Sequence, residues 1–302
     1  MSDQQEVGPA NAPAYAARTI GQIRLHGAWR HELAHHCPKS RLFWLTRGTT
    51  RITAELHPIM ATGPKILFIP ASMLLSLELP TQLQGHVAYF PNLADLELPQ
   101  TSLCLTPSSA EAQVELTGLV ERMARLEDED TASARRMKRG FGLPLSAMLE
   151  RETLISNQRD RDATHRLRTQ IKKPSKSAQL LSRFAALLAQ GFNAQLGVSD
   201  YAARLDVTPA HLTRIFREIT GRTALALINE VLMAEARRRL VDTDDSAAKI
   251  ARDLGYSSRL FHARFWPRNR HNPHRISRTK KGAMAQHAPP IAPVSLSHAA
   301  PQ

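Results

Sequence analysis

A run near the N-terminus has the residue types and spacing of a zinc site. His31, Glu32 and His35 fit the pattern His-Glu-x-x-His. On a helix, this pattern presents two imidazoles to a metal and a glutamate as general base. The pattern is short, other histidines lie nearby, no further ligand motif follows, and the run precedes expected strands. The sequence therefore disfavours a zinc protease.

A weaker metal hypothesis adds a histidine from a later strand. His31, His35 or His36, and His86 could hold a metal inside a β-barrel, as in enzymes of the cupin type. The paired histidines and glutamate of those enzymes have no counterpart at the required spacing here. We therefore expect a metal-free regulatory pocket, with no catalytic residue, no metal and no cofactor.

A second group of residues has the types and spacing of a DNA-reading surface. Arg214 could form paired hydrogen bonds with guanine, and Thr213 or Ala210 could contact a thymine methyl group. Arg217 lies one turn further along and is better placed for phosphate. A solvated helix face is an equally good interpretation of any one of these residues. The predicted outward positions of a helix over residues 208–220 are Thr208, Ala210, His211, Thr213, Arg214 and Arg217.

Two short helices must position this surface. Ser199 is the expected N-cap of the first helix, and the chain breaks at Asp206 and Val207. Thr208 can cap the second helix, with Pro209 at its first position, where a missing N–H costs nothing. Gly221 is the expected left-handed stop. The inward positions of the second helix are Leu212, Ile215, Phe216 and Ile219. This pattern is typical of a helix-turn-helix.

The charge distribution agrees with a polyanion partner for the C-terminal half. The chain has 302 residues and a formal net charge of +13. Residues 1–150 carry 14 basic and 15 acidic side chains, whereas residues 151–302 carry 26 and 12. A basic half joined to a neutral half indicates nucleic-acid binding, although a solubilising basic tail is an equal alternative on charge alone.

The N-terminal half has the pattern of a small β domain. Short apolar runs separated by Gly and Pro predict strands over residues 41–46, 49–56, 65–69, 73–79 and 86–90, which indicates a barrel or sandwich. Helices are then expected from Ser108 or Ser109 to about residue 126, over residues 145–157 and over residues 177–190. Residues 159–176 are charged and read as a linker.

The sequence has no pattern typical of secretion or of membrane insertion. Cys37 and Cys104 are too few for a disulfide framework and are better explained as small buried residues than as redox sensors. No signal-peptide pattern and no apolar run long enough to span a bilayer are present. We therefore expect a cytoplasmic protein.

The residues from 199 to 256 resemble the AraC/XylS family of transcription regulators. The segments LTRIFREITG, ALINEVLMAEARRRL and DDSAAKIARDLGYSS carry the resemblance. In that family a long helix joins two helix-turn-helix units about one DNA turn (~34 Å) apart. The resemblance implies such a bridge over residues 225–240, with Arg237, Arg238 and Arg239 near phosphate. It also implies a second unit capped by Ser246, with its turn at Gly255.

The same resemblance implies an N-terminal cupin-like domain that binds a small-molecule effector or mediates dimerisation. The segments FWLTRGTTRIT and ILFIPASM resemble strands of that domain. Trp29, Phe43, Trp44 and Phe68 could line a pocket, although aromatic residues at strand spacing are more often core.

The sequence departs from the family after Ser258. One permitted codon choice for residues 259–278, read one nucleotide later, encodes GYFTRVFGRATGITPTAYRA, which resembles the missing second recognition helix and closing segment. A frameshift near Ser258 would explain the departure, and a divergent tail is the alternative. Residues 259–302 contain Lys and Arg but no Asp or Glu, so they could bind phosphate without sequence preference.

Taken together, the sequence predicts an α+β protein, with a cupin-like β-barrel or sandwich followed by an all-α double helix-turn-helix domain whose second unit is incomplete. The expected division is a flexible start (1–20), a β sensor domain (21–107), connecting helices and linker (108–176), a DNA-binding domain (177–258) and a basic, disordered tail (259–302). The expected function is sequence-specific regulation of transcription, without enzymatic activity. A cupin-type or zinc metalloenzyme with an accessory helical domain, and a regulator impaired by a frameshift, are the alternatives. Expected partners are double-stranded DNA, an effector, a second copy of the chain and, for an activator, RNA polymerase.

Overall fold

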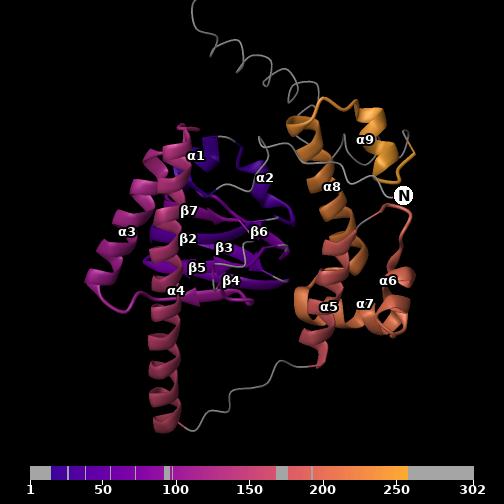
Figure 1. Ribbon diagram of the computed structural model, residues 1–302. Helices are drawn as coiled ribbons and strands as arrows, with labels where there is room; N and C mark the ends of the chain where they lie inside the picture. The colour runs from indigo at the N-terminus through magenta and orange to yellow at the C-terminus, as the bar shows by residue number, and fades with distance from the viewer. Residues whose placement is uncertain are drawn as a thin grey trace, which may run out of the picture. The chain divides into compact units, whose positions relative to one another are not determined.

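The computed structural model describes residues 15–257, apart from residues 26, 38, 55, 72, 92–95, 97, 168–175 and 192. The chain divides into two compact units, residues 1–235 and residues 236–302. Strands lie in the N-terminal part and helices follow (Figure 1). The α+β class expected from the sequence is confirmed.

Two antiparallel sheets form the N-terminal domain. The larger has the order β1-β7-β2-β5-β8 and the smaller β4-β3-β6. The strands are β1 (Ala16–Thr19), β2 (Ser40–Arg47), β3 (Thr49–Ala54), β4 (His57–Thr62), β5 (Lys65–Ile69), β6 (Leu75–Leu77), β7 (Gln84–Phe90) and β8 (Leu103–Leu105). Two short helices, α1 (Ile20–Leu25) and α2 (Trp29–Glu32), lie between β1 and β2 in the chain. The described strands form two sheets that are not joined edge to edge, so the domain is an open sandwich and not a closed barrel.

All five predicted strands are present, and β1, β4 and β8 are additional. Strand β4 was not predicted, because Pro58 interrupts the alternation of apolar and polar residues and Met60 is exposed. Pro58 is tolerated because β4 pairs only with β3 in its sheet, and an edge strand can lose one backbone donor.

Strand β2 is buried on both faces and therefore separates two apolar cores. Phe43 and Leu45 belong to the core that includes β3 and β6. Leu42 and Trp44 belong to the core formed with helices α3 and α4. This two-sided burial explains why β2 reads as a continuous apolar run rather than as an alternating strand.

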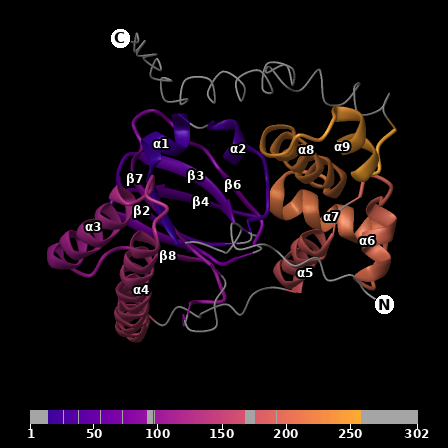
Figure 2. The ribbon, with the colours of Figure 1, turned by 45° about the horizontal axis from the view of Figure 1, so that its top comes forward.

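Helices α3 (Ala110–Arg125) and α4 (Ala132–Leu167) lie beside each other against the larger sheet (Figures 1 and 2). Ser109 is the N-cap of α3, as one of the two predicted alternatives, and accepts a hydrogen bond from the Ala112 amide. Buried Glu152 of α4 accepts hydrogen bonds from the Ser108 amide and hydroxyl. This carboxylate fixes α4 to the segment that precedes α3.

Helix α4 corrects two predictions. It begins 13 residues before the expected start at Leu145, and it continues through residues 159–167, which the sequence predicted as a linker. Pro144 lies inside it. Because residues 159–167 are mostly polar, their composition alone did not distinguish a helix from a linker.

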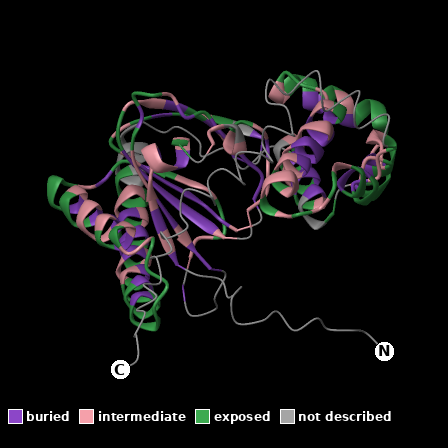
Figure 3. Cartoon of the chain, turned by 90° about the horizontal axis from the view of Figure 1, so that it is seen from above, coloured by how far each residue is buried: buried purple, intermediate pink, exposed green. Residues whose placement is uncertain are grey.

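The remaining helices are α5 (Lys176–Gln190), α6 (Val198–Arg204), α7 (Pro209–Thr220), α8 (Ala224–Asp242) and α9 (Ala247–Asp253). Their buried residues lie on inward faces and their exposed residues on outward faces (Figure 3). No helix among the described residues is long and apolar enough to cross a membrane. The expected tail, residues 259–302, lies outside the described residues.

Candidate nucleic-acid interface

Helix α6 begins two residues earlier than predicted. Its N-cap is Gly197, whereas the sequence predicted Ser199. The carboxylate of Asp200 accepts a hydrogen bond of 2.7 Å from the Gly197 amide. This bond stabilises the first turn without a capping side chain at Gly197.

The turn between α6 and α7 lies at the predicted break. Asp206 has a left-handed backbone conformation, with φ of 58°. The Val207 amide then donates to the Ala202 carbonyl at 3.0 Å. Aspartate tolerates this region better than most residues other than glycine, so a sharp turn forms here without glycine.

Both predicted ends of α7 are confirmed. The Thr208 hydroxyl accepts from the His211 amide at 3.2 Å, and Pro209 occupies the first turn. Gly221 has φ of 66°, and its amide donates to the Arg217 carbonyl. Both ends of α7 are therefore stabilised by capping hydrogen bonds.

An aromatic cluster holds α6 and α7 against α5. The ring of Phe184 lies 5.2 Å from that of Tyr201 and 4.7 Å from that of Phe216, measured between centroids. All three side chains are buried. Helical spacing predicted Phe216 as an inward residue, whereas Tyr201 was not predicted as core.

The opposite face of α7 is exposed, as the helical spacing predicted. Thr213 is half-buried, so it is less accessible than the other predicted contact residues. The exposed members are Thr208, Ala210, His211, Arg214 and Arg217. The structure thus places the six predicted residues of this element on one helix and its cap, with five of them open to solvent.

Arg214 has an acidic partner that was not predicted from the sequence. Its Nη1 donates to Glu218 Oε1 at 2.6 Å, and its Nη2 lies 3.3 Å from Nδ1 of His211. The side chains of Arg214 and Glu218 are 58% and 53% exposed. Water therefore screens this pair, and its net stabilisation is small. The spacing of four residues on a helix was the signal that could have revealed it.

The predicted phosphate-contacting arginines lie in the C-terminal part of α8. Arg238 is exposed and its Nη1 lies 3.8 Å from a carboxylate oxygen of Asp242. Arg237 is half-buried. Arg239, the third predicted residue, pairs with Asp253 of α9 at 3.4 Å, so its side chain joins these two helices.

Helix α9 repeats α6 at an offset of 49 residues, since the two span Ala247–Asp253 and Val198–Arg204. Ser246 caps α9 by accepting from the Lys249 amide, as predicted. Gly255, the predicted turn, has φ of 79°, and the Tyr256 amide donates to the Ala251 carbonyl at 2.8 Å. A second helix-turn element is therefore present up to Ser257, the last described residue.

The candidate zinc motif does not form a metal site. Helix α2 ends at Glu32, and Leu33 is extended, so His31 and His35 do not share a helix face. Nδ1 of His35 donates to the Leu33 carbonyl and Nε2 lies 3.0 Å from Arg41. The described residues contain no group of three or more possible ligands that could hold a metal ion.

The aromatic residues proposed to line a pocket separate into different environments. Phe43 faces the core between the two sheets, whereas Trp44 and Phe68 face the core with α3. The side chain of Trp29 lies outside the described part of the structure.

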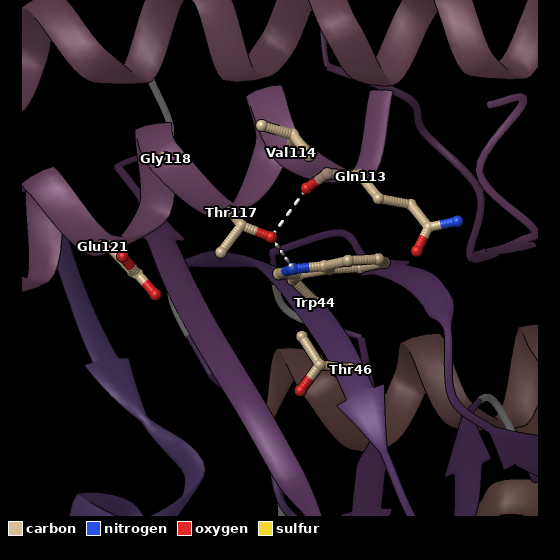
Figure 4. Close-up of a pocket in the computed structure, with 7 residues that line it drawn as sticks. All are labelled: Trp44, Thr46, Gln113, Val114, Thr117, Gly118 and Glu121. Atoms are coloured by element: carbon tan, nitrogen blue, oxygen red, sulfur yellow. Dashed lines mark hydrogen bonds between the residues drawn. The ribbon is translucent and has the colours of Figure 1, made fainter. Parts of the chain in front are cut away.

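Trp44 lines a surface hollow of about 480 Å³ between β2 and α3 (Figure 4). Its Nε1 donates to the Thr117 hydroxyl at 2.9 Å, and that hydroxyl donates to the Gln113 carbonyl at 2.6 Å. The hollow also contacts Val114 and Glu121. Because these hydrogen bonds are satisfied internally, the indole does not offer its donor to a ligand.

Comparison with known proteins identifies the helical region. Residues 201–277 match a family model described as a helix-turn-helix domain, of the AraC type. This region is an AraC-type helix-turn-helix domain. This match supports a role of the helical region in DNA binding and transcription regulation. The AraC-type domain match extends through residues 258–277, where the sequence predicted a departure from the family. These residues lie outside the described part of the structure, so the frameshift hypothesis stays a prediction.

Solved structures similar to this chain include proteins with AraC-type domains. The C-terminal domain of AraT, a response regulator from Geobacillus stearothermophilus, is 23% identical over 36% of this chain and 88% of its own, with a TM-score of 0.32. ToxT from Vibrio cholerae is 11% identical over 83% and 93%, with a TM-score of 0.38. The AraC-like transcriptional activator CuxR is 14% identical over 80% and 76%, with a TM-score of 0.30. A comparison with curated proteins found no match.

Proposed function

We propose that the chain regulates transcription by sequence-specific DNA binding, with α7 in the major groove. The observation that carries this proposal is the geometry of α7. Phe216 on its buried face packs on Phe184 of α5, while its opposite face presents Arg214 and Arg217 to solvent. A helix with two fixed ends and a basic outer face suits the groove, where side chains near its N-terminus reach base edges.

Individual roles follow from position along α7. Arg214 has a planar guanidinium suited to guanine, and Arg217 lies closer to the helix end, where phosphate contacts are common. Arg237 and Arg238 of α8 are proposed to contact phosphate. We assign Thr208, Ala210, His211 and Thr213 to the same interface on their place on α7 and its cap.

The N-terminal sandwich is proposed to bind a small-molecule effector, to pair two chains, or both. Its strands and helices enclose two apolar cores. Exposed apolar side chains on α3 and α4, including Val114 and Leu154, support a role in pairing. RNA polymerase is a further partner if the protein activates transcription.

The test begins with selection of binding sites from a random duplex pool by the full-length protein. Affinity for a selected site and for its scrambled version is then measured by fluorescence anisotropy at several salt concentrations. We expect Arg214→Ala to weaken binding to the selected site by ~1–3 kcal/mol and to relax base preference there. Arg183→Ala, an exposed arginine on α5, is the control and should leave the preference unchanged.

Two results would count against this assignment. An equal loss on selected and scrambled DNA would place Arg214 at phosphate. Failure to enrich any sequence from the pool, with a folded protein, would contradict sequence-specific binding altogether.

A further inference from the structure

The surface hollow between β2 and α3 combines apolar side chains with a carboxylate. Its volume is about 480 Å³, and Glu121 is the charged residue among those that line it. Trp44 of β2 and Val114 of α3 supply its apolar surface (Figure 4). Sites for small molecules have volumes of this order, with mostly apolar linings and few polar groups. The hollow therefore has the size of a ligand site and carries negative charge.

The carboxylate of Glu121 has no close cationic partner in the described part of the chain. Its Oε2 lies 3.9 Å from Nη2 of Arg125 on the same helix, which is beyond hydrogen-bond distance. The side chains of Glu121 and Arg125 are 43% and 77% exposed, so water screens this pair. Glu121 is therefore available to a cation that enters the hollow.

The neighbouring histidine does not balance this charge. His86 of β7 lies opposite Trp44 in the pairing of β2 with β7. Burial lowers the pKa of His86, and the negative charge of Glu121 offsets part of that shift. Because the pKa stays below its usual value, the His86 ring is neutral at neutral pH.

Gly118 leaves room in the hollow. It lies in the interior of α3, where glycine is less favourable than alanine. A Cβ added at Gly118 would have no heavy atom of a neighbouring element within 4 Å. Close packing therefore does not require glycine at this position, whereas a large side chain here would occupy part of the hollow.

We propose that the hollow binds a small organic cation, an amine with an apolar body, whose ammonium group pairs with Glu121. This inference rests on the proposed function, because it gives the chemistry of an effector. It places that ligand on the helix-covered face of the larger sheet and not between the two sheets. The indole N–H of Trp44 is bonded to Thr117, so the ring offers apolar surface to the body of the amine. The Glu121 carboxylate attracts an ammonium group and repels an anion.

The test uses the full-length protein without DNA, with hexylamine and benzylamine as probes and benzyl alcohol as the uncharged control. Titration calorimetry should detect binding of at least one amine, and benzyl alcohol should bind at least about tenfold more weakly than benzylamine. The indole N–H signal of Trp44 should shift in heteronuclear NMR spectra as the amine is added. This signal reports on the hollow itself.

Two variants and a matched control locate the site. Glu121→Gln removes the charge and keeps the shape, so it should weaken amine binding by about tenfold or more. Gly118→Leu should abolish binding without lowering Tm, because leucine is a better helix former than glycine and its Cβ displaces no neighbouring element. Glu115→Gln changes an exposed glutamate of α3 that pairs with Arg151 and does not line the hollow. This control should bind amines as the wild type does.

Three outcomes would overturn the proposal: neither amine binds, benzyl alcohol binds as tightly as benzylamine, or Glu121→Gln binds as tightly as the wild type. If neither amine binds and Gly118→Leu lowers the dimer fraction in sedimentation velocity, a second copy covers the hollow and the proposal fails. Because no DNA is present, a negative result here is distinct from a failure of DNA binding.

Discussion

Helices α6 and α9, each with the turn that follows, have similar backbone geometry made from different residues. The left-handed residue is Asp206 in the first element and Gly255 in the second. The N-cap is Gly197 in the first and Ser246 in the second. In both, the residue after the left-handed position donates to a carbonyl five residues earlier.

The two turns have the same backbone shape for different reasons: residue type in one, and packing against other helices in the other. Gly255 adopts a positive φ without steric cost, and Ser246 caps its helix directly. The first turn places an aspartate where glycine is preferred, and it is supported by Tyr201, which packs on Phe184. The second turn is therefore encoded mainly by its own residues, whereas the first depends more on α5 and α7.

The largest expected effect tests that dependence. Phe184→Ala removes a buried ring that contacts both α6 and α7, and it should lower the free energy of unfolding by about 3–5 kcal/mol. Amide hydrogen exchange should accelerate in α6 and α7 more than in α9. Leu225→Ala, at a side chain that is 47% exposed on α8, is the control. Equal acceleration in α9 would show that the two elements unfold together.

A smaller effect tests the local encoding of the second turn. Gly255→Ala forces a Cβ into the left-handed region and should lower the free energy of unfolding by roughly 1–2 kcal/mol. Chemical denaturation of the full-length protein measures this change, and exchange rates in α9 locate it. A change below a few tenths of a kcal/mol would mean that residues beyond Gly255 determine the turn.

The smallest effect has the opposite sign. Asp206→Gly relieves the left-handed conformation of a residue with a side chain, and it should raise the free energy of unfolding by about 0.5 kcal/mol. The greater freedom of glycine in the unfolded state offsets part of the gain. Denaturation under the conditions used for Gly255→Ala gives a direct comparison. Destabilisation by Asp206→Gly would indicate that the carboxylate itself supports the turn.

The sequence was most informative where a residue acts on its own backbone. Thr208, Pro209, Gly221 and Gly255 have the predicted roles, because capping and positive φ depend on residue type. The five strands with apolar patterns were also predicted. By contrast, β4 was missed because the proline rule applies differently at a sheet edge, which only the pairing reveals.

The candidate site was predicted in outline but not in its contacts. The exposed face of α7 followed from helical periodicity, whereas the pairing of Arg214 with Glu218 depends on rotamers that periodicity does not specify. The His-Glu-x-x-His pattern binds zinc only on a helix that includes both histidines, and α2 ends at Glu32, before His35. The hollow beside Glu121 could not be predicted, because it depends on how α3 packs on β2.

The pairing of Arg214 with Glu218 would affect how the protein searches DNA if Arg214 contacts DNA as proposed. On random sequence, Arg214 would then exchange the Glu218 carboxylate for a phosphate, which replaces one anion by another. At a guanine in the correct register, the same exchange would yield two base hydrogen bonds. Glu218 would therefore lower the attraction to random DNA more than it lowers binding at a cognate site. We expect it to shorten residence on the many competing sites of a genome and to widen the specificity ratio.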